Sequence, residues 1–249
     1  MSDGQRPVYF IVGAAGGVGR ALTARLVAKG AEVVAVGRNE DRLASLAQET
    51  GASPLVLDAR SVEGIAQGMA TTVQRFGRLD GAVNLAGSIL LKSAGQTSEA
   101  EWDEVLATNL KTAFAVVRGA APVLAQAGGG SIVLMSSVAA RVGLMNHEAI
   151  AAAKAGVVGL TLAAAATYAP KNVRINAIAP GLVDTPLAGR ILSHEASRRA
   201  SEAMHPLGRV GNPVQIASAI SWLLDAEQDW VTGQVLGVDG GLGSLRGRP

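Results

Sequence analysis

Short apolar runs alternate along this chain with longer stretches of helical periodicity, and this alternation limits the possible folds more than any other feature. We predict buried strands at residues 8–12, 32–36, 54–57, 81–84, 131–135, 174–177 and 235–238. Strands that are separated by helices form βαβ units and therefore run parallel. The sequence thus predicts an α/β fold: a single domain over residues 1–249, with a doubly wound parallel sheet and helices on both faces.

Composition excludes several classes of protein. The chain has 249 residues, of which 49% are hydrophobic and 17% charged, which suits one domain with a large core. It has no cysteine, which excludes disulfides and thiolate chemistry. Its histidines, His147, His194 and His205, are far apart, so we predict no metal site. The net charge is +2 with scattered basic residues, so nucleic-acid binding is not expected.

The ends of the chain and its apolar stretches indicate a protein of the cell interior. Residues 1–7 are polar and lack the hydrophobic region of a signal peptide, and residues 245–249 form a short basic end. The alanine-rich stretch at residues 155–169 is too short for a membrane span. We therefore expect a cytoplasmic protein without membrane contact.

A glycine-rich turn follows the first predicted strand and precedes a helix predicted at residues 20–29. Glycines permit a tight turn and close approach of a ligand, and the N–H groups of a helix N-terminus attract a pyrophosphate. Ordinary strand-to-helix turns also contain glycines, but the flanking strands favour dinucleotide binding by a Rossmann-type fold. The candidate cofactor contacts in this turn are Gly13, Gly16, Gly17, Val18 and Gly19.

The turn is the first in a longer series of motifs. The series continues with Asp58-Ala59, Asn84-Leu85-Ala86-Gly87, Asn109, Ser137, Lys154, Asn176-Ala177-Ile178-Ala179-Pro180-Gly181, Val183, Thr185 and Asp239-Gly240-Gly241. Through these motifs the chain resembles the short-chain dehydrogenase/reductase family, close to its 3-oxoacyl-ACP reductase-like members, over essentially its whole length. The resemblance implies a nicotinamide cofactor, held by the turn together with Asp58, Ala59, Asn84, Ala86, Gly87, Lys154, Pro180, Gly181, Val183 and Thr185. It also implies a small-molecule substrate and a homotetramer.

The end of the second predicted strand bears on the choice of cofactor. An acidic residue there would bind the ribose of NAD, but this chain has Gly37 followed by Arg38, whose guanidinium suits the 2′-phosphate of NADP. We therefore favour NADP, although Arg38 could also be a solvated residue at the start of a helix. Asp58 resembles the family residue that holds the adenine amino group, but an aspartate after a strand can also be a helix cap.

The catalytic frame of the family is present except at one position. In the family a serine precedes a tyrosine by thirteen positions and a lysine follows the tyrosine by four. Ser137 and Lys154 have this spacing around residue 150, which is Ile150. The tyrosine is therefore absent rather than displaced.

The resemblance assigns a role to each remaining group: Ser137 polarises a carbonyl, Lys154 holds the nicotinamide ribose, and Asn109 anchors a water relay. Loss of the tyrosine acid would cost ~10²–10⁴ in rate. Tyr9 lies in the first strand and Tyr168 lies ~21 Å along a helix from Lys154, so neither can replace it. His147 is one turn before Ile150 and is a candidate catalytic acid, unless it belongs to a solvated helix start capped by Asn146.

Three hypotheses follow from this frame. The one we favour is a reductase of imines or activated alkenes, which need less help from a protein acid. The second is a carbonyl reductase that uses His147 or water as its acid, and the third is a protein that binds NADP without turnover. The substrate pocket would be bounded by residues 141–145 and 182–208, which are largely apolar. The homotetramer would be built from helices beginning near residues 100 and 151 and from the strand at 235–239.

Overall fold

The computed structural model, which describes residues 6–245, contains one parallel sheet in the order β3-β2-β1-β4-β5-β6-β7. Its strands are β1 (Val8–Val12), β2 (Glu32–Gly37), β3 (Ser53–Val56), β4 (Gly81–Asn84), β5 (Gly130–Met135), β6 (Val173–Pro180) and β7 (Val235–Val238). Every neighbouring pair is parallel, so the predicted doubly wound α/β fold is confirmed. The residues before 6 and after 245, including most of the expected basic end, lie outside the described part.

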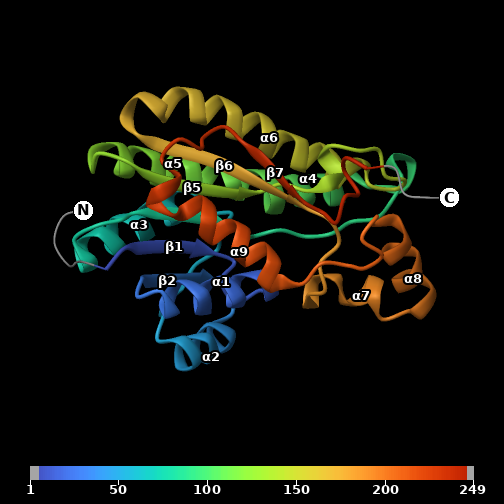
Figure 1. Ribbon diagram of the computed structural model, residues 1–249, viewed down its shortest axis with the longest axis horizontal. Helices are drawn as coiled ribbons and strands as arrows, with labels where there is room; N and C mark the ends of the chain where they lie inside the picture. Colours follow the sequence, from blue (N-terminus) through green and yellow to red (C-terminus); the bar gives the residue numbers. More distant parts are fainter. Residues whose placement is uncertain (1–5, 246–249) are drawn as a thin grey trace.

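Helices cover both faces of the sheet (Figure 1). One face carries α1 (Gly17–Ala28), α2 (Glu40–Thr50) and α9 (Pro213–Leu224), and the other carries α3 (Val62–Phe76), α5 (Thr112–Gln126) and α6 (Glu148–Tyr168). The short helix α4 (Glu99–Leu106) packs beside α6 and continues through a π-helical turn, η2 (Ala107–Lys111), into α5. Two further helices, α7 (Gly189–Leu192) and α8 (Glu195–Met204), form a small lobe at the edge of the molecule.

The central strand β1 shows why this sequence forms such a sheet. Successive side chains of a strand point to opposite faces. Phe10 and Val12 enter the core under α3, α5 and α6, whereas Tyr9 and Ile11 enter the core under α1 and α9. All five residues of β1 are buried, because helices cover both of its faces.

Helix α1 begins at Gly17, three residues before the predicted start. Glycines have a low helix propensity, so their clustering in the turn masks the start of the helix in the sequence. Gly16 is the N-cap residue and has an extended conformation. Gly17 and Gly19 of the motif therefore lie in the helix, whereas Gly13 and Gly16 lie in the turn before it.

One expectation about membranes needs correction. The segment Glu148–Lys171, which comprises α6 and the short helix after it, has a mean hydropathy of 1.7 over its most apolar window and is long enough to cross a membrane. The sequence prediction concerns residues 155–169 alone, which are part of this longer segment. In the fold, α6 packs against β6, β5 and α5, and its buried residues include Val157, Ala164 and Ala165. Packing on the sheet therefore accounts for the apolar character of its inner face.

His205 connects the small lobe to the end of β6. The His205 side chain is buried, its Nε2 accepts a hydrogen bond from the Leu182 N–H at 3.2 Å, and its Nδ1 lies 2.7 Å from the Ser201 carbonyl oxygen. An amide N–H can only donate, so Nε2 is the acceptor and Nδ1 carries the proton. The neutral imidazole thus holds the start of the segment after β6 against α8.

We expect His205→Leu to lower the free energy of unfolding by about 1–3 kcal/mol, because it leaves the Leu182 N–H and the Ser201 carbonyl without partners. Urea unfolding followed by circular dichroism measures the change. His205→Gln retains an acceptor and should recover part of the loss, and Met204→Leu, on the exposed neighbour, should change stability by less than about 0.5 kcal/mol. A His205→Leu protein as stable as the wild type would contradict this role.

Candidate functional site

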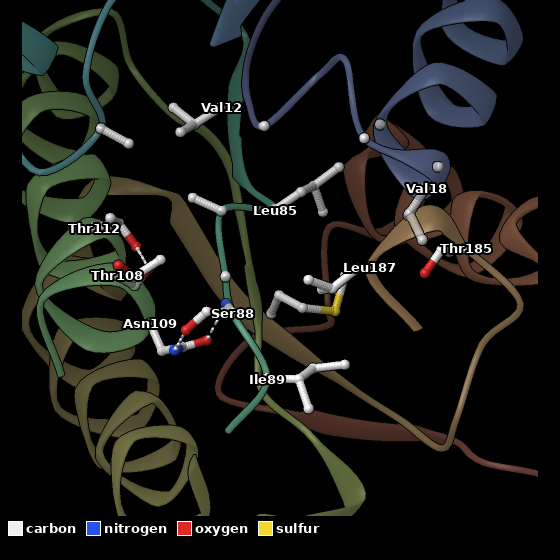
Figure 2. Close-up of a pocket in the computed structure, with 18 of the residues that line it drawn as sticks. Val12, Val18, Leu85, Ser88, Ile89, Thr108, Asn109, Thr112, Thr185 and Leu187 are labelled. Atoms are coloured by element: carbon white, nitrogen blue, oxygen red, sulfur yellow. Dashed lines mark hydrogen bonds between the residues drawn. The ribbon is translucent and has the colours of Figure 1, made fainter. Parts of the chain in front are cut away.

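A cavity of about 850 Å³ opens at the carboxyl ends of the strands. It is lined by the glycine-rich turn after β1, the ends of β2 to β6, and the segment after β6 that leads to α7. In parallel α/β sheets, ligands bind outside the carboxyl ends of the strands, where the direction of winding reverses. Figure 2 shows this arrangement, with Asn109 and Ser88 on one side of the cavity and Thr185 and Leu187 on the other.

The glycine-rich turn has no space for side chains at three positions. A Cβ atom on Gly19 would lie 2.4 Å from the Gly13 carbonyl oxygen, and one on Gly17 would lie 2.9 Å from Thr185 Cγ2. Gly13 has a φ of +79°, and a Cβ there would lie 2.9 Å from the Ala86 nitrogen. The backbone of β1, α1 and the β4 end therefore meet in one compact cradle.

The N-terminus of α1 faces this cradle without a side-chain cap. Gly16 makes no capping hydrogen bond, and the first turn of α1 contains no acidic residue. The first N–H groups of a helix have no partners within the helix, and the helix dipole favours negative charge there. A pyrophosphate fits this cradle, which a Cβ at Gly19 or Gly17 would obstruct.

Basic side chains surround one end of the cavity. Arg38, at the end of β2, is exposed and lies near enough to Asp58 to help lower the pKa of its carboxyl group. Arg42, in the first turn of α2, donates a hydrogen bond to the Ala15 carbonyl oxygen at 3.2 Å and so bridges to the glycine-rich turn. Both line the cavity together with Asn39. This end suits a phosphate monoester.

Asp58 is held by Arg60. The guanidinium of Arg60 donates to both carboxylate oxygens, at 2.8 Å and 3.1 Å to Oδ2 and 3.2 Å to Oδ1. These hydrogen bonds lower the pKa of Asp58 below its usual value, so Asp58 is charged at neutral pH. The cap of the following helix α3 is Ser61, whose Oγ accepts from the Gly64 N–H at 3.1 Å. Asp58 is therefore not a helix cap, and its predicted contact with an adenine stays a prediction.

Asn109 lies in the π-helical turn η2 and is fully buried. Its Nδ2 donates to Ser88 Oγ and to the Val105 carbonyl oxygen, both at 3.0 Å, and its Oδ1 accepts from the Ser88 N–H at 3.2 Å. Both amide protons of Asn109 are therefore committed. Single π-helical turns inside α-helices occur frequently at functional sites.

Lys154, on α6, lines the same end of the cavity. Its Nζ donates a hydrogen bond to the Met135 carbonyl oxygen at the end of β5, at 2.8 Å. Burial disfavours the charged amine and lowers the pKa of Lys154 to about 8. Within residues 6–245 no carboxylate forms an ion pair with Lys154.

Ile150 lies one helical turn before Lys154 and also lines the cavity. Its side chain is 6% exposed and packs with Val105, Ala149 and Ala153. Ser137, at the end of β5, accepts a hydrogen bond from the Ala139 N–H at 3.2 Å, so its hydroxyl proton is not used in that contact. This part of the cavity therefore combines an apolar wall with one hydroxyl and one amine.

Neither tyrosine lines the cavity, in agreement with the estimate from the sequence. Tyr9 is buried in β1, where burial and the nearby Asp80 raise its pKa to about 12. Tyr168 is the last residue of α6. No histidine in residues 6–245 lines the cavity, and no group of three histidine, aspartate or glutamate side chains in this range is placed to hold a metal ion.

Most of the residues predicted from the sequence line this one cavity. They are Gly13, Gly16, Gly17, Val18, Gly19, Arg38, Asp58, Ala59, Ala86, Gly87, Asn109, Ser137, Lys154, Pro180, Gly181, Val183 and Thr185. Asn84 does not: it is buried, donates to Thr112 Oγ1 at 3.1 Å and accepts from the Ala86 N–H at 3.3 Å. It therefore orients the backbone beside the cavity and does not face it.

His147 also lies outside the cavity lining. It is the N-cap residue of α6, and its Nδ1 lies 2.7 Å from the Met145 carbonyl oxygen, so the ring is held by the preceding loop. The expectation that Asn146 caps this helix is wrong, since Asn146 adopts a left-handed conformation with φ of 62° one residue earlier.

The sequence predictions missed several polar side chains of the cavity, among them Arg42, Arg60 and Ser88. Arg42 follows Arg38 by four residues, which is one helical turn, and Ser88 directly follows the motif residue Gly87. Both spacings could have pointed to these two residues from the sequence. Arg60 binds the Asp58 carboxylate, and no motif in the sequence pointed to Arg60.

Comparisons with known proteins agree with this geometry. The family model described as Enoyl-(Acyl carrier protein) reductase matches residues 13–243. The chain is 37% identical over 240 residues to the 3-oxoacyl-(acyl-carrier-protein) reductase FabG of Thermotoga maritima, which covers 94% of this chain and 97% of that protein. The chain belongs to the short-chain dehydrogenase/reductase family. Its resemblance to the 3-oxoacyl-ACP reductase-like members is thereby confirmed.

Solved structures of this short-chain dehydrogenase/reductase fold include proteins with bound cofactor. ElxO with NADP bound has a TM-score of 0.91 at 28% identity, covering 97% of this chain and all of that one (100%). A variant of actinorhodin polyketide ketoreductase with NADPH has a TM-score of 0.92 at 30% identity, covering 98% and 100%. ElxO is also known with NADPH bound as a tyrosine-to-phenylalanine variant.

For this short-chain dehydrogenase/reductase we expect Gly19→Ala to destabilise the protein by about 1–3 kcal/mol, because the new Cβ would overlap the Gly13 and Ala14 carbonyl oxygens of the turn. Chemical unfolding measures this change. Gly95→Ala is the matched control, since a Cβ at Gly95 meets nothing within 4 Å. Equal stability of the two variants would show that the turn tolerates a side chain.

Proposed function

We propose that this protein is an NADP-dependent oxidoreductase that reduces an imine or an activated alkene on a small apolar substrate. The observation that carries the proposal is the apolar residue Ile150. It lies with Ser137 and Lys154 at one end of the cavity, which we call the reacting end, and the rest of the cavity suits a nicotinamide cofactor. A ketone needs a proton on its oxygen as hydride arrives, and the family's tyrosine would give it. An imine is basic enough to take a proton from a weaker acid, and an activated alkene can take its proton from water.

NADP is the cofactor, and residues of this chain would hold its pyrophosphate, its 2′-phosphate and its nicotinamide ribose. The cradle formed by the glycine-rich turn and the N-terminus of α1 would hold the pyrophosphate. Arg38 and Arg42 would hold the 2′-phosphate, since both line the cavity beside the end of β2. Lys154 would hold the nicotinamide ribose. The structures of ElxO and of the ketoreductase with NADP or NADPH support this cofactor.

The bound cofactor supplies hydride, and the chain's own residues orient the substrate and keep water away. Ser137 Oγ accepts from the Ala139 N–H and can donate its own proton to a substrate nitrogen or oxygen. Ile150, Ile89 and Leu187 provide apolar walls. Ile89 and Leu187 are 37% and 56% exposed, so an apolar substrate would cover surface that is open without it.

Two other functions from the sequence hypotheses remain as outcomes of the test. A carbonyl reductase would need another acid, and the hydrogen bond of His147 to the loop at Met145 does not favour His147 in this role. A protein that binds NADP without turnover would show binding and no reduction of any substrate. The tyrosine-to-phenylalanine variant of ElxO shows that this fold can hold NADPH with one tyrosine hydroxyl removed, so cofactor binding alone does not distinguish the cases.

We also propose a cytoplasmic homotetramer. Trp102 on α4, Phe114 on α5 and Leu162 on α6 are large apolar side chains that are 38%, 46% and 51% exposed. They lie on neighbouring helices of one face. At the edge of the sheet, no strand within residues 6–245 pairs with the outer side of β7, and Leu236 on this strand is 37% exposed. These two surfaces suit self-association.

The first test compares NADPH oxidation with ketones, cyclic imines and enones of matched size. We expect the wild type to reduce imines or enones faster than ketones by about 10²-fold or more, because only ketones need the strong acid. Ile150→Tyr should raise ketone reduction by ~10²–10⁴, and Ile150→Phe, which has the ring without the hydroxyl, should not. Wild-type turnover of simple ketones at rates equal to those of imines and enones, unchanged in His147→Ala, would overturn the proposal.

The second test concerns the 2′-phosphate. We expect Arg38→Ala and Arg42→Ala each to weaken NADPH binding by roughly 10- to 100-fold, since a charge-assisted hydrogen bond contributes about 1.5–3 kcal/mol. NADH binding should change by less than threefold, as measured by calorimetry. Arg118→Ala, on the outer side of α5, is the control and should bind both cofactors as the wild type does. Equal losses for NADPH and NADH would show that these arginines do not contact the 2′-phosphate.

A further inference from the structure

Within residues 6–245, one ionisable side chain, that of Lys154, lines the reacting end of the cavity. The charged residues that line the cavity are Arg38, Arg42, Asp58, Arg60 and Lys154. The first four lie at the ends of β2 and β3 or on the helices that follow them, whereas Lys154 contacts the end of β5. Two strands, β1 and β4, separate β2 from β5, which corresponds to ~14 Å at ~4.8 Å per strand. Only Lys154 is therefore near Ser137 and Ile150.

The amine of Lys154 is positioned at this end by the backbone. One of its N–H groups bonds to the Met135 carbonyl oxygen at 2.8 Å, which leaves two donors for other partners. A Cβ built on Gly87 would lie 3.6 Å from Lys154 Nζ and 3.0 Å from Asn109 Oδ1, so the amine and the amide flank the same glycine. The absence of a side chain at Gly87 keeps the space beside the amine open to the cavity.

The surroundings of Lys154 allow its proton to leave. Burial removes the hydration that favours the ammonium form, and the described part of the chain provides no carboxylate to hold the charge in its place. With a pKa of about 8, the group is mostly protonated at neutral pH and is a far stronger acid than an exposed lysine. Efficient general acids have pKa values near the working pH.

The other polar groups of the cavity are less suited to give a proton. Both amide protons of Asn109 are bonded to Ser88 Oγ and the Val105 carbonyl oxygen. In the described part of the chain, no base or cation is bonded to Ser137 Oγ to acidify its proton, and the Oγ accepts a hydrogen bond from the Ala139 N–H. Ile150 has no proton to give.

We propose that Lys154 is the proton donor of this site and transfers a proton from Nζ to the nitrogen of a neutral imine substrate. The inference rests on the proposed function and specifies its substrate as an imine that must be protonated before reduction. In the step, one Nζ–H bond breaks and a substrate N–H bond forms, which leaves a neutral lysine amine and an iminium ion. Hydride from NADPH then reduces the iminium carbon to give an amine and NADP⁺, and the lysine regains a proton from water.

The test uses two substrates that differ by one N-methyl group and in their need for a proton: a cyclic alkyl imine and its N-methyl iminium salt. The iminium salt already carries the positive charge. Lys154→Arg keeps a cation and hydrogen-bond donors, but arginine does not release a proton in proteins. We expect this variant to lose ~10²–10⁴ in kcat for the imine and less than tenfold for the iminium salt.

The pH dependence gives a second readout on the wild type. The protonated amine is the active form, so kcat for the imine should fall as the pH rises through about 8, whereas kcat for the iminium salt should stay level. In the cofactor-free protein, ¹⁵N NMR of the lysine Nζ atoms should show one signal titrating near pH 8 that is missing in Lys154→Arg. The chain's lysines are Lys29, Lys92, Lys111, Lys154 and Lys171, so the assignment is direct.

Chemical rescue covers the case in which arginine does not fit. Lys154→Ala should regain imine reduction when small primary ammonium ions are added, and the rescued rate should vary with the acidity of the added ammonium ion. A purely structural cation would rescue without such a dependence.

The outcomes separate the two proposals. Equal losses of imine and iminium reduction in Lys154→Arg, with rescue independent of ammonium acidity, would assign Lys154 to cofactor binding only and overturn the inference. Unchanged imine reduction in the variant would overturn it as well. A wild type that binds NADPH but reduces none of the imine, the iminium salt and the enones would instead overturn the proposed function, and reduction of the enones alone would overturn this inference only.

Discussion

The parallel arrangement of the sheet sets the position of each chemical group in this protein. All strands end at the same edge, and the helices that follow β1, β2 and β3 begin there. Gly13, Asp58 and Ser137 are far apart in the sequence but meet around one cavity for this reason. The approach of α1 to β1, which requires glycine at position 19, brings the N-terminus of the helix close enough to the strand ends to form an anion site. Without this shared edge, the separate motifs could not contact the same ligand.

At the reacting end of the cavity, apolar packing and the acidity of Lys154 have the same physical cause. Ile150 and its neighbours on α4 and α6 form a buried apolar cluster on the helix that carries Lys154. Burial destabilises the ammonium form of Lys154, because the Met135 carbonyl oxygen replaces only part of its hydration. A change that makes the wall more polar would therefore also alter the proton affinity of the amine. Substrate environment and proton chemistry are coupled through a few side chains on one helix.

The sequence was most informative where a pattern is local. The apolar run at residues 8–12 correctly predicted strand Val8–Val12, and the spacing of Ser137 and Lys154 correctly indicated that Ile150 lies one helical turn before Lys154. It was least informative where contacts are distant. The hydrogen bond from Arg42 to Ala15 and the buried hydrogen bond from Asn84 to Thr112 both depend on how separate elements pack. His147 was placed near the site from helix geometry alone, but the hydrogen bond to Met145 holds it in the loop.

The sequence by itself determined the α/β class, the positions of the strands and the absence of a tyrosine at position 150, since these follow from short-range periodicity, motif order and the residue types themselves. It also identified most of the residues that line the cavity. Only the tertiary structure decided which polar groups share the reacting end, which of them are already bonded, and how strongly Lys154 holds its proton. Those properties depend on burial and on distances between elements, because desolvation and hydrogen bonding act through space and not along the chain.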